Sequence, residues 1–225
     1  MAIAEGLIRM TGPAVGNIEL ATRFADRGKR SAVGAHGYFC GGLIFELPDG
    51  LSDRLNPIHR RVELPVAWRV LLIRPKQTAP AVFGAAETKH FSELQPADPS
   101  RRDMLVSIVT REILPAVERA DFHWFADSVG RYNTESGRLF ELVQGGVFNG
   151  PIVTEAVHRL GRKGYGGCGQ SSWGPTVFAW CATQSQANDL ADQFRDDAYN
   201  IMVVEPLNTP RGIQLGKHQS RSDGT

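Results

Sequence analysis

The chain has 225 residues, of which 42% are hydrophobic and 22% charged, a composition typical of globular proteins that form one large domain or two small ones. Its 25 Lys and Arg against 24 Asp and Glu leave a formal net charge of +1, which gives no general attraction to nucleic acid or to an anionic membrane. The three cysteines form no C-x-x-C pair, and no apolar run approaches the roughly 20 residues that span a bilayer. We therefore expect a cytoplasmic protein without a disulfide framework, a structural zinc site, a nucleic-acid partner or a membrane partner.

The first third of the chain is predicted to begin with helices and to continue with strands. Residues 1–12 have the pattern of a helix that starts without a cap, and a second helix follows and ends at Gly28. Small residues at 29–37 predict a loop. The β-rich segments 43–47 and 67–73 are predicted to be strands of one antiparallel sheet.

Helical periodicity dominates the middle of the chain and gives way to a strand, a helix and a strand. The first long helix is expected to be capped by Ser100 and to kink or end at Pro115. The last three elements have the pattern of the second half of a ferredoxin-like β-α-β-β-α-β unit, and the tail after Pro206 is predicted to be loose. The predicted helices are 100–117, 123–143, 152–162 and 185–194, and the predicted strands are 176–181 and 200–204.

Several conspicuous side chains have ordinary structural interpretations. Two basic clusters, 59–61 and 101–102, are expected to be solvated surface turns. Asp127, Arg131 and Asn133 lie on one predicted helix, where they either line a cleft or form an exposed polar face. The indoles expected in the core are Trp68, Trp124 and Trp180.

The most informative segment is 164–179, where five glycines and two adjacent serines lie between a helix and a strand. Glycine allows positive φ and lets another group approach the backbone closely. The pattern is compatible with a tight turn and bulge in a sheet, and equally with a loop that binds a ligand. Trp173 lies inside this segment, where its indole either stacks on an aromatic ligand or packs under the loop.

The string Ser171-Ser172-Trp173-Gly174-Pro175-Thr176-Val177-Phe178-Ala179 resembles the C-terminal glycine motif of the superfamily of galactokinase, homoserine kinase, mevalonate kinase and phosphomevalonate kinase (GHMP kinases). Within that superfamily, the run Gly169 to Thr176, the segment Arg30 to Gly34 and the segment Gly37 to Gly42 resemble β-ribofuranosylaminobenzene 5′-phosphate synthase. The resemblance extends over most of residues 1–204.

The resemblance implies a reaction of phosphoribosyl pyrophosphate with 4-aminobenzoate or 4-hydroxybenzoate that releases carbon dioxide and pyrophosphate, as the entry to methanopterin-type carriers. It also admits Mg²⁺ as a cofactor and a homodimer as the assembly. Such a reaction needs groups that stabilise departing pyrophosphate and hold the aromatic carbon near the ribose.

The candidate site residues come from two segments. Lys29 and Arg30 are expected to meet a phosphate or carboxylate, while His36 and Ser31 are the catalytic candidates, His36 because an imidazole exchanges protons near neutral pH. A single histidine is also common in a purely structural role. The backbone amides of the glycine motif are expected to bind anionic oxygens, which makes the remaining substrate-binding candidates Gly169, Gln170, Ser171, Ser172, Trp173 and Gly174.

Two departures from the kinase pattern affect the functional hypothesis. When residues 31–34 are aligned with the Ser-Gly-Val-Asp segment of mevalonate-type kinases, Gly34 takes the position of the catalytic aspartate. This makes a kinase less favoured as the function but does not exclude it, because other kinases of the superfamily lack that aspartate. The other glycine-rich loop of the superfamily, which cradles phosphates before a helix, is not found in this sequence. We therefore expect an N-terminally shortened member of the superfamily.

The sequence thus predicts an α+β, GHMP-kinase-like fold with a truncated N-terminal domain at 1–66, a ferredoxin-like C-terminal domain at 67–206 and a polar tail at 207–225. The leading hypothesis is a decarboxylating phosphoribosyl transferase. The alternatives are a small-molecule kinase that uses ATP, and an inactive module that binds or dimerises.

Overall fold

The structure is a computed structural model that describes residues 1, 18–28, 31–48, 54–76, 85–94, 98–195 and 198–212. The predicted helix at 1–12, the binding candidates Lys29 and Arg30, and most of the tail lie outside the described residues. The chain forms two compact units: residues 1–61 together with 207–225, and residues 62–206.

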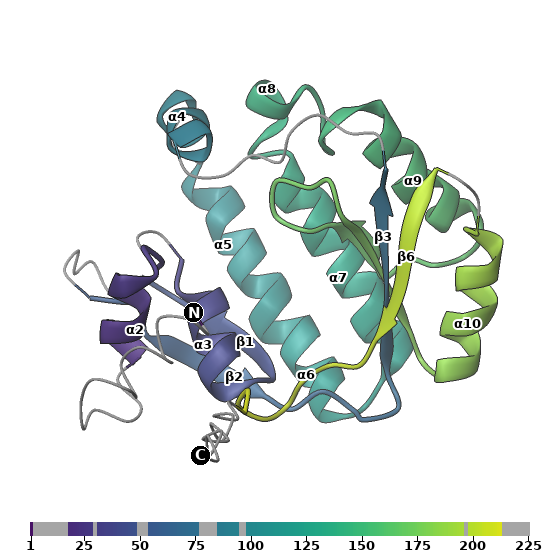
Figure 1. The fold of residues 1–225 in the computed structure, drawn as a ribbon, viewed down its shortest axis with the longest axis horizontal. Coiled ribbons are helices and arrows are strands. Elements are labelled where there is room, and N and C mark those ends of the chain that lie inside the picture. Colours follow the sequence, from purple (N-terminus) through teal and green to yellow (C-terminus); the bar gives the residue numbers. More distant parts are fainter. Residues whose placement is uncertain are drawn as a thin grey trace, which may run out of the picture. The chain divides into compact units, whose positions relative to one another are not determined.

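In the first unit, helices α2 (Ile18–Phe24) and α3 (Val33–Cys40) accompany a two-stranded sheet of β1 (Leu43–Glu46) and β2 (Ile58–Val62) (Figure 1). The helix predicted before Gly28 is present as α2, but it ends earlier, at Phe24. The loop predicted at 29–37 is wrong from Val33 onward, because that segment is α3. The Glu46 carboxylate explains this helix: its two oxygens accept the Ala32 N–H at 2.8 and 3.1 Å, and a negative charge at a helix N-terminus is stabilising.

The basic cluster 59–61 is not a surface turn, because it lies in β2. The half-buried Arg61 guanidinium donates to the carbonyl oxygens of Gly41, Cys40 and Asn208 at 2.9, 3.1 and 2.5 Å. The Gly42 N–H also donates to the Leu207 carbonyl at 2.6 Å. The first described residues after Pro206 are therefore tied to the first unit rather than loose.

The second unit is built on a four-stranded antiparallel sheet in the order β4-β5-β3-β6. Its strands are β3 (Arg69–Pro75), β4 (Cys168–Gln170), β5 (Val177–Cys181) and β6 (Tyr199–Val204). This order, with helices between β3 and β4 and between β5 and β6, is the ferredoxin-like arrangement that the sequence predicts. The expectation that 43–47 and 67–73 share one sheet is wrong, because β1 pairs with β2 and β3 lies between β5 and β6.

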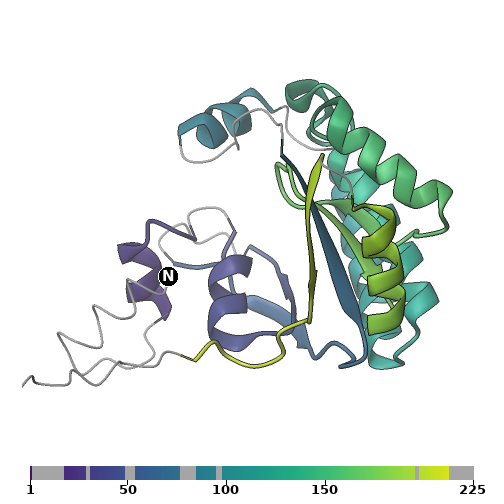
Figure 2. The same cartoon turned by 45° about the vertical axis from the view of Figure 1, so that its right-hand side comes forward.

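The core of this unit lies between the sheet and two helices, α9 (Gly150–Arg162) and α10 (Gln184–Gln193), which run along one face of the sheet (Figure 2). In α9 the buried residues Val153, Ala156, Val157 and Leu160 recur at helical spacing. They pack with Leu71, Ile73, Val177, Ala179 and Cys181 from the alternating positions of β3 and β5. Each large apolar side chain buried in this way contributes roughly 1.5–3 kcal/mol.

The remaining helices of this unit differ from their predicted bounds for local reasons. The first long helix is interrupted, as α5 (Pro99–Ile108), a π-helical turn (Val109–Ile113) and α6 (Leu114–Glu118). Pro115 has no N–H to donate to the preceding turn, and the π-helical turn before it accommodates the missing hydrogen bond. Asp98, not Ser100, caps α5, because its carboxylate accepts the Ser100 N–H at 3.0 Å.

The helix predicted at 123–143 is divided into α7 (Phe122–Gly137) and α8 (Glu141–Gln144). Within this unit, helix α4 (Ala85–Glu93) was not predicted. The last helix and the last two strands are confirmed within two residues. In the described part of the chain, no helix combines the length and apolar character needed to cross a membrane.

Burial separates the three cysteine thiols. Cys168 and Cys181 are buried, and loss of hydration raises the pKa of each thiol to about 11, whereas Cys40 is half-buried. At pH 8 only about one in a thousand molecules of a thiol with such a pKa is the reactive thiolate. Neither Cys168 nor Cys181 is suited to be a nucleophile.

We expect iodoacetamide to label the folded chain at pH 8 once, at Cys40, and to label all three cysteines in urea. Mass spectrometry of tryptic peptides measures the sites, and Cys40→Ser is the control that abolishes labelling of the folded chain. Labelling of Cys168 or Cys181 without urea would contradict the burial of these two thiols.

Candidate functional site

The glycine motif forms the end of β4 and a tight loop, residues 171–176, which we call the glycine loop. The Ser171 N–H donates to the Thr176 carbonyl at 2.9 Å, and the Gly174 N–H donates to the Ser171 carbonyl at 2.8 Å. Ser172 and Gly174 have φ of 50° and 71°. Two of the amides expected to bind an anion are therefore used inside the loop. Within the described residues the N–H groups of Ser172 and Trp173 have no partner.

Helix α7 holds the free edge of β4 through one side chain, Asn133. Its Nδ2 donates to the Gln170 carbonyl at 2.9 Å, and its Oδ1 accepts the Gln170 N–H at 2.9 Å, so the amide takes the place of a neighbouring strand. Gly169 makes room for it, because a Cβ at this position would lie 2.8 Å from the Cβ of Asn133. The group that approaches the backbone closely at Gly169 is thus a side chain of helix α7.

A second set of amides fixes the loop from the other side. The buried Gln170 side chain accepts the Asn149 N–H at 2.6 Å and donates to the Ser172 carbonyl at 2.7 Å. Asn149 Nδ2 donates to the Trp173 carbonyl at 2.7 Å, and Gln144 Nε2 donates to the Val147 carbonyl at 2.8 Å. The buried Gln170 and the half-buried Asn149 and Gln144 thus form their hydrogen bonds within the protein, and these bonds rigidify the loop.

Trp173 lies under the loop, 5% exposed, at the centre of an aromatic cluster. Its ring centroid lies 4.8 Å from that of Phe140 and 5.4 Å from those of Phe91 and His90, all in edge-to-face geometry. Of the two alternatives for this indole, packing under the loop is confirmed. The same indole also lines a cavity.

This cavity, which we call the aromatic chamber, has a volume of about 220 Å³ and lies between α4, α7, α8 and the glycine loop. Its walls combine aromatic rings with neutral polar groups. The lining residues are Phe91, Tyr132, Asn133, Ser136, Gly137, Phe140, Gln144, Val147, Gln170, Ser172 and Trp173. None of these described residues carries a charged side chain.

Three hydroxyl groups of the aromatic chamber have no hydrogen-bond partner within the described residues: those of Tyr132, Ser136 and Ser172. Tyr132 and Ser136 lie one turn apart on α7 and therefore share a face of the helix. Burial raises the pKa of Tyr132 above its usual value, so its hydroxyl stays protonated at neutral pH and remains able to donate. The chamber thus offers neutral hydroxyls to a ligand.

The other sequence candidates lie in the first unit. His36 is 8% exposed and its Nε2 donates to the Asn56 carbonyl at 2.8 Å, a contact that a structural histidine makes. Ser31 is exposed and its Oγ accepts the Val33 N–H at 3.4 Å. Of the three candidates for a cleft on α7, only Asn133 lines the aromatic chamber; Arg131 forms an ion pair with Glu112, and Asp127 is exposed.

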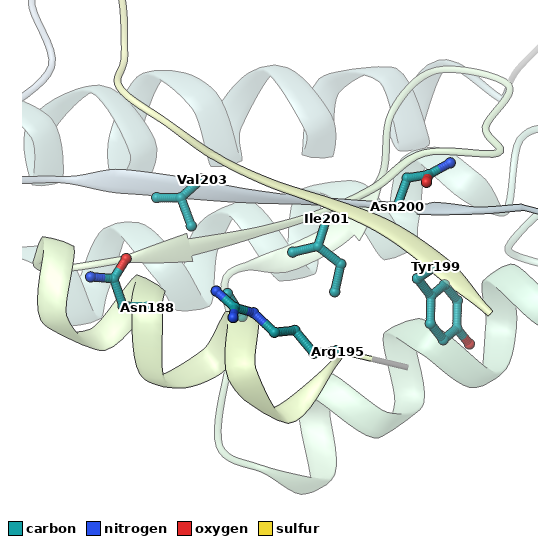
Figure 3. A pocket seen from close by; sticks show the side chains of 7 residues that line it. Asn188, Arg195, Tyr199, Asn200, Ile201 and Val203 are labelled. Atoms are coloured by element: carbon teal, nitrogen blue, oxygen red, sulfur yellow. The ribbon is translucent and has the colours of Figure 1, made fainter. Parts of the chain in front are cut away.

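A second hollow lies between α10 and β6, where Arg195 and Asn188 face the strand residues Tyr199, Ile201 and Val203 (Figure 3). Arg195 is 76% exposed and forms an ion pair with Asp192 at 3.1 Å. Such an exposed pair interacts weakly with its surroundings. The aromatic chamber is the stronger candidate site because it borders the glycine loop and contains unpaired hydroxyls.

The model of the family "GHMP kinases C terminal" matches residues 113–200, which contain the glycine motif, β4, β5 and α10. Residues 113–200 of the second unit are thus similar to the C-terminal domain of GHMP kinases. A curated protein named beta-ribofuranosylphenol 5'-phosphate synthase, from Methanothermobacter thermautotrophicus, is 25% identical over 165 residues, which cover 68% of this chain and 49% of that protein. The chain therefore spans about half the length of this relative.

Solved structures agree with a GHMP-kinase-like fold. A homoserine kinase from Cytophaga hutchinsonii aligns with a TM-score of 0.54 at 13% identity, covering 90% of this chain and 62% of that one. A putative homoserine kinase from Listeria monocytogenes aligns with a TM-score of 0.53 at 14% identity, covering 92% and 63%. At these identities the likeness concerns the fold. The α+β, GHMP-kinase-like fold predicted from the sequence is confirmed.

Most residues of the aromatic chamber were not predicted from the sequence. Tyr132, Ser136 and Phe140 lie at four-residue spacing within the helix predicted at 123–143, but this spacing is also that of an ordinary core face. Phe91 belongs to the unpredicted α4. The sequence signal on this helix was Asn133, for which a cleft-lining position and an exposed polar face were equally compatible with the pattern.

We expect Asn133→Ala to lower the free energy of unfolding by about 2–4 kcal/mol, because the N–H and carbonyl of Gln170 both lose their partner. Urea unfolding followed by circular dichroism measures the change. The matched control is Asn188→Ala on α10, whose side chain makes an exposed hydrogen bond to Gln184, with an expected change within about 0.5 kcal/mol. Equal effects of the two substitutions would show that the β4 edge does not depend on Asn133.

Proposed function

We propose that this chain takes part in joining a phosphoribosyl group to a small aromatic acid, with release of pyrophosphate and carbon dioxide. The observation that carries the proposal is the aromatic chamber beside the glycine loop, in a chain that is similar to a ribofuranosylphenol phosphate synthase over 68% of its length. The donor in this proposal is phosphoribosyl pyrophosphate, and the acceptor is 4-hydroxybenzoate or 4-aminobenzoate.

In the proposed reaction, one aromatic carbon loses its bond to the carboxylate and gains a bond to C1 of the ribose. The carbon that bears the carboxylate attacks C1 of the ribose, and the bond from C1 to pyrophosphate breaks. The electron pair of the bond to the carboxylate then returns to the ring as carbon dioxide leaves. The site must therefore hold a ring and an anionic leaving group side by side.

The glycine loop and the aromatic chamber divide these two tasks in the proposal. The unpaired amides of Ser172 and Trp173 are donors for anionic oxygens, together with the exposed hydroxyls of Ser171 and Ser172. The rings of Trp173 and Phe140 supply an apolar surface for the acceptor ring. Lys29, Arg30, His36 and Ser31 remain sequence-based candidates for further contacts.

Mg²⁺ is proposed to enter with the pyrophosphate group of the donor. Among the described residues, no three His, Cys, Asp or Glu side chains gather in a way that would hold a metal ion. No step of the proposed reaction is assigned to a metal ion.

The homoserine kinases of similar fold make a small-molecule kinase the second candidate, which would consume ATP. An assay that follows both donors separates the two functions. We expect the protein to release pyrophosphate and carbon dioxide from phosphoribosyl pyrophosphate and carboxyl-labelled 4-hydroxybenzoate or 4-aminobenzoate, and to leave ATP intact with either acid and with homoserine.

The assay is run on this chain and on a form extended through the upstream reading frame, because the chain matches about half of its relative. Trp173→Ala is expected to lower turnover at least about 100-fold, since it removes the central ring of the chamber. Trp124→Ala is the matched control; this half-buried indole contacts Arg119 at 5.6 Å and does not line the chamber. ATP consumption without pyrophosphate release would establish the kinase instead, and silence of both forms, shown to be folded, would overturn the proposal.

A further inference from the structure

The size of the aromatic chamber limits its ligand to about one ring. A cavity of roughly 150 Å³ is enough to hold benzene. Pockets for drug-sized ligands occupy roughly 300–1,000 Å³. At about 220 Å³ the aromatic chamber fits a ring with one or two small substituents.

The chemistry of its walls limits the ligand further. The described lining residues carry no charge, and burying an ionised carboxylate among neutral groups is costly. The side-chain amides of Asn133, Gln144 and Gln170 are already engaged with the protein. The unpaired hydroxyls of Tyr132 and Ser136 therefore remain for a ligand, and they suit a group that both donates and accepts.

We propose that the aromatic chamber is a subsite for the neutral end of a monocyclic aromatic acid: the ring lies against Trp173 and Phe140, its para hydroxyl or amino group meets Tyr132 and Ser136, and its carboxylate stays outside at the glycine loop. This inference rests on the proposed function for the identity of the acid. It adds the location of the ring, its direction and the residues that recognise the para group.

The direction agrees with the proposed reaction. In 4-hydroxybenzoate and 4-aminobenzoate, the carbon that forms the new bond lies opposite the hydroxyl or amino group. With that group inside the chamber, the reacting carbon faces the exposed Ser172 and the unpaired amides of the loop. The opposite orientation would bury the carboxylate and turn the reacting carbon away from the donor.

The test is a binding series on the whole chain, measured by isothermal titration calorimetry and by saturation-transfer NMR. We expect 4-hydroxybenzoate to bind at least about fivefold more tightly than benzoate, because benzoate leaves the two hydroxyls unpaired. Terephthalate, which replaces the inner hydroxyl by a second carboxylate, is expected to bind at least about 30-fold more weakly than 4-hydroxybenzoate.

Tyr132→Phe tests the recognition itself. We expect this variant to lose most of the preference for 4-hydroxybenzoate over benzoate while binding benzoate as before. The matched control is Tyr165→Phe, a half-buried tyrosine that does not line the aromatic chamber, which should keep the preference. A purely structural role of Tyr132 would weaken both ligands equally.

Ser136→Leu provides a second, independent variant, because a larger side chain fills the chamber. It is expected to abolish binding of both 4-hydroxybenzoate and benzoate. The inference is overturned if 4-hydroxybenzoate binds with the same affinity to wild type, Tyr132→Phe and Ser136→Leu, if terephthalate binds as well as 4-hydroxybenzoate, or if no acid binds at millimolar concentration.

The inference and the proposed function fail in different experiments. Selective binding that depends on Tyr132, in a protein that releases no pyrophosphate, would support the subsite and reject the synthase reaction. Turnover in a protein whose variants at Tyr132 and Ser136 keep wild-type KM for 4-hydroxybenzoate would support the reaction and reject the subsite.

Discussion

The pairing of the Asn133 side chain with the backbone of Gln170 is the contact on which the candidate site depends. β4 has only three residues and pairs with β5 on one side. Without the Asn133 amide, the N–H and the carbonyl of Gln170 on the other side of β4 would have no hydrogen-bond partner. The amide satisfies both groups and joins the sheet to α7 at the point where the glycine loop begins. The loop, Trp173 below it and the helix face with Tyr132 and Ser136 are consequently held as one rigid assembly.

The hydrogen bonds of the side-chain amides determine what the site offers to a ligand. Asn133, Asn149 and Gln170 bond to the protein and form walls, whereas the hydroxyls of Tyr132, Ser136 and Ser172 remain free within the described residues. Because the walls are already in place, ligand binding needs no rearrangement of them. The unpaired hydroxyls favour a ligand that can hydrogen-bond to them over one that cannot. Rigidity and selectivity in the aromatic chamber thus have the same origin.

The sequence predicted those elements whose signals are local. Helix α9, helix α10 and strands β5 and β6 follow from periodicity, because one face of each is buried against the same core. Helix α3 and strand β2 were missed because distant residues stabilise them: Glu46 caps the first, and Arg61 ties the second to three carbonyls. The short strand β4 was missed because its glycines read as a loop, and its partner on the free edge is a side chain rather than a strand.

From the sequence alone, a ligand-binding role of the glycine motif could not be distinguished from a packing role. Gly169 is explained by the approach of Asn133, so the motif need not bind anything to require this glycine. What packing leaves unexplained is the pair of free amides at Ser172 and Trp173 and the neutral cavity beside them. A nucleotide is too large and too charged for a neutral space of about 220 Å³, whereas one aromatic ring with a neutral substituent fits both its volume and its polarity. The physical properties of the aromatic chamber therefore favour an aromatic acceptor over ATP as its occupant.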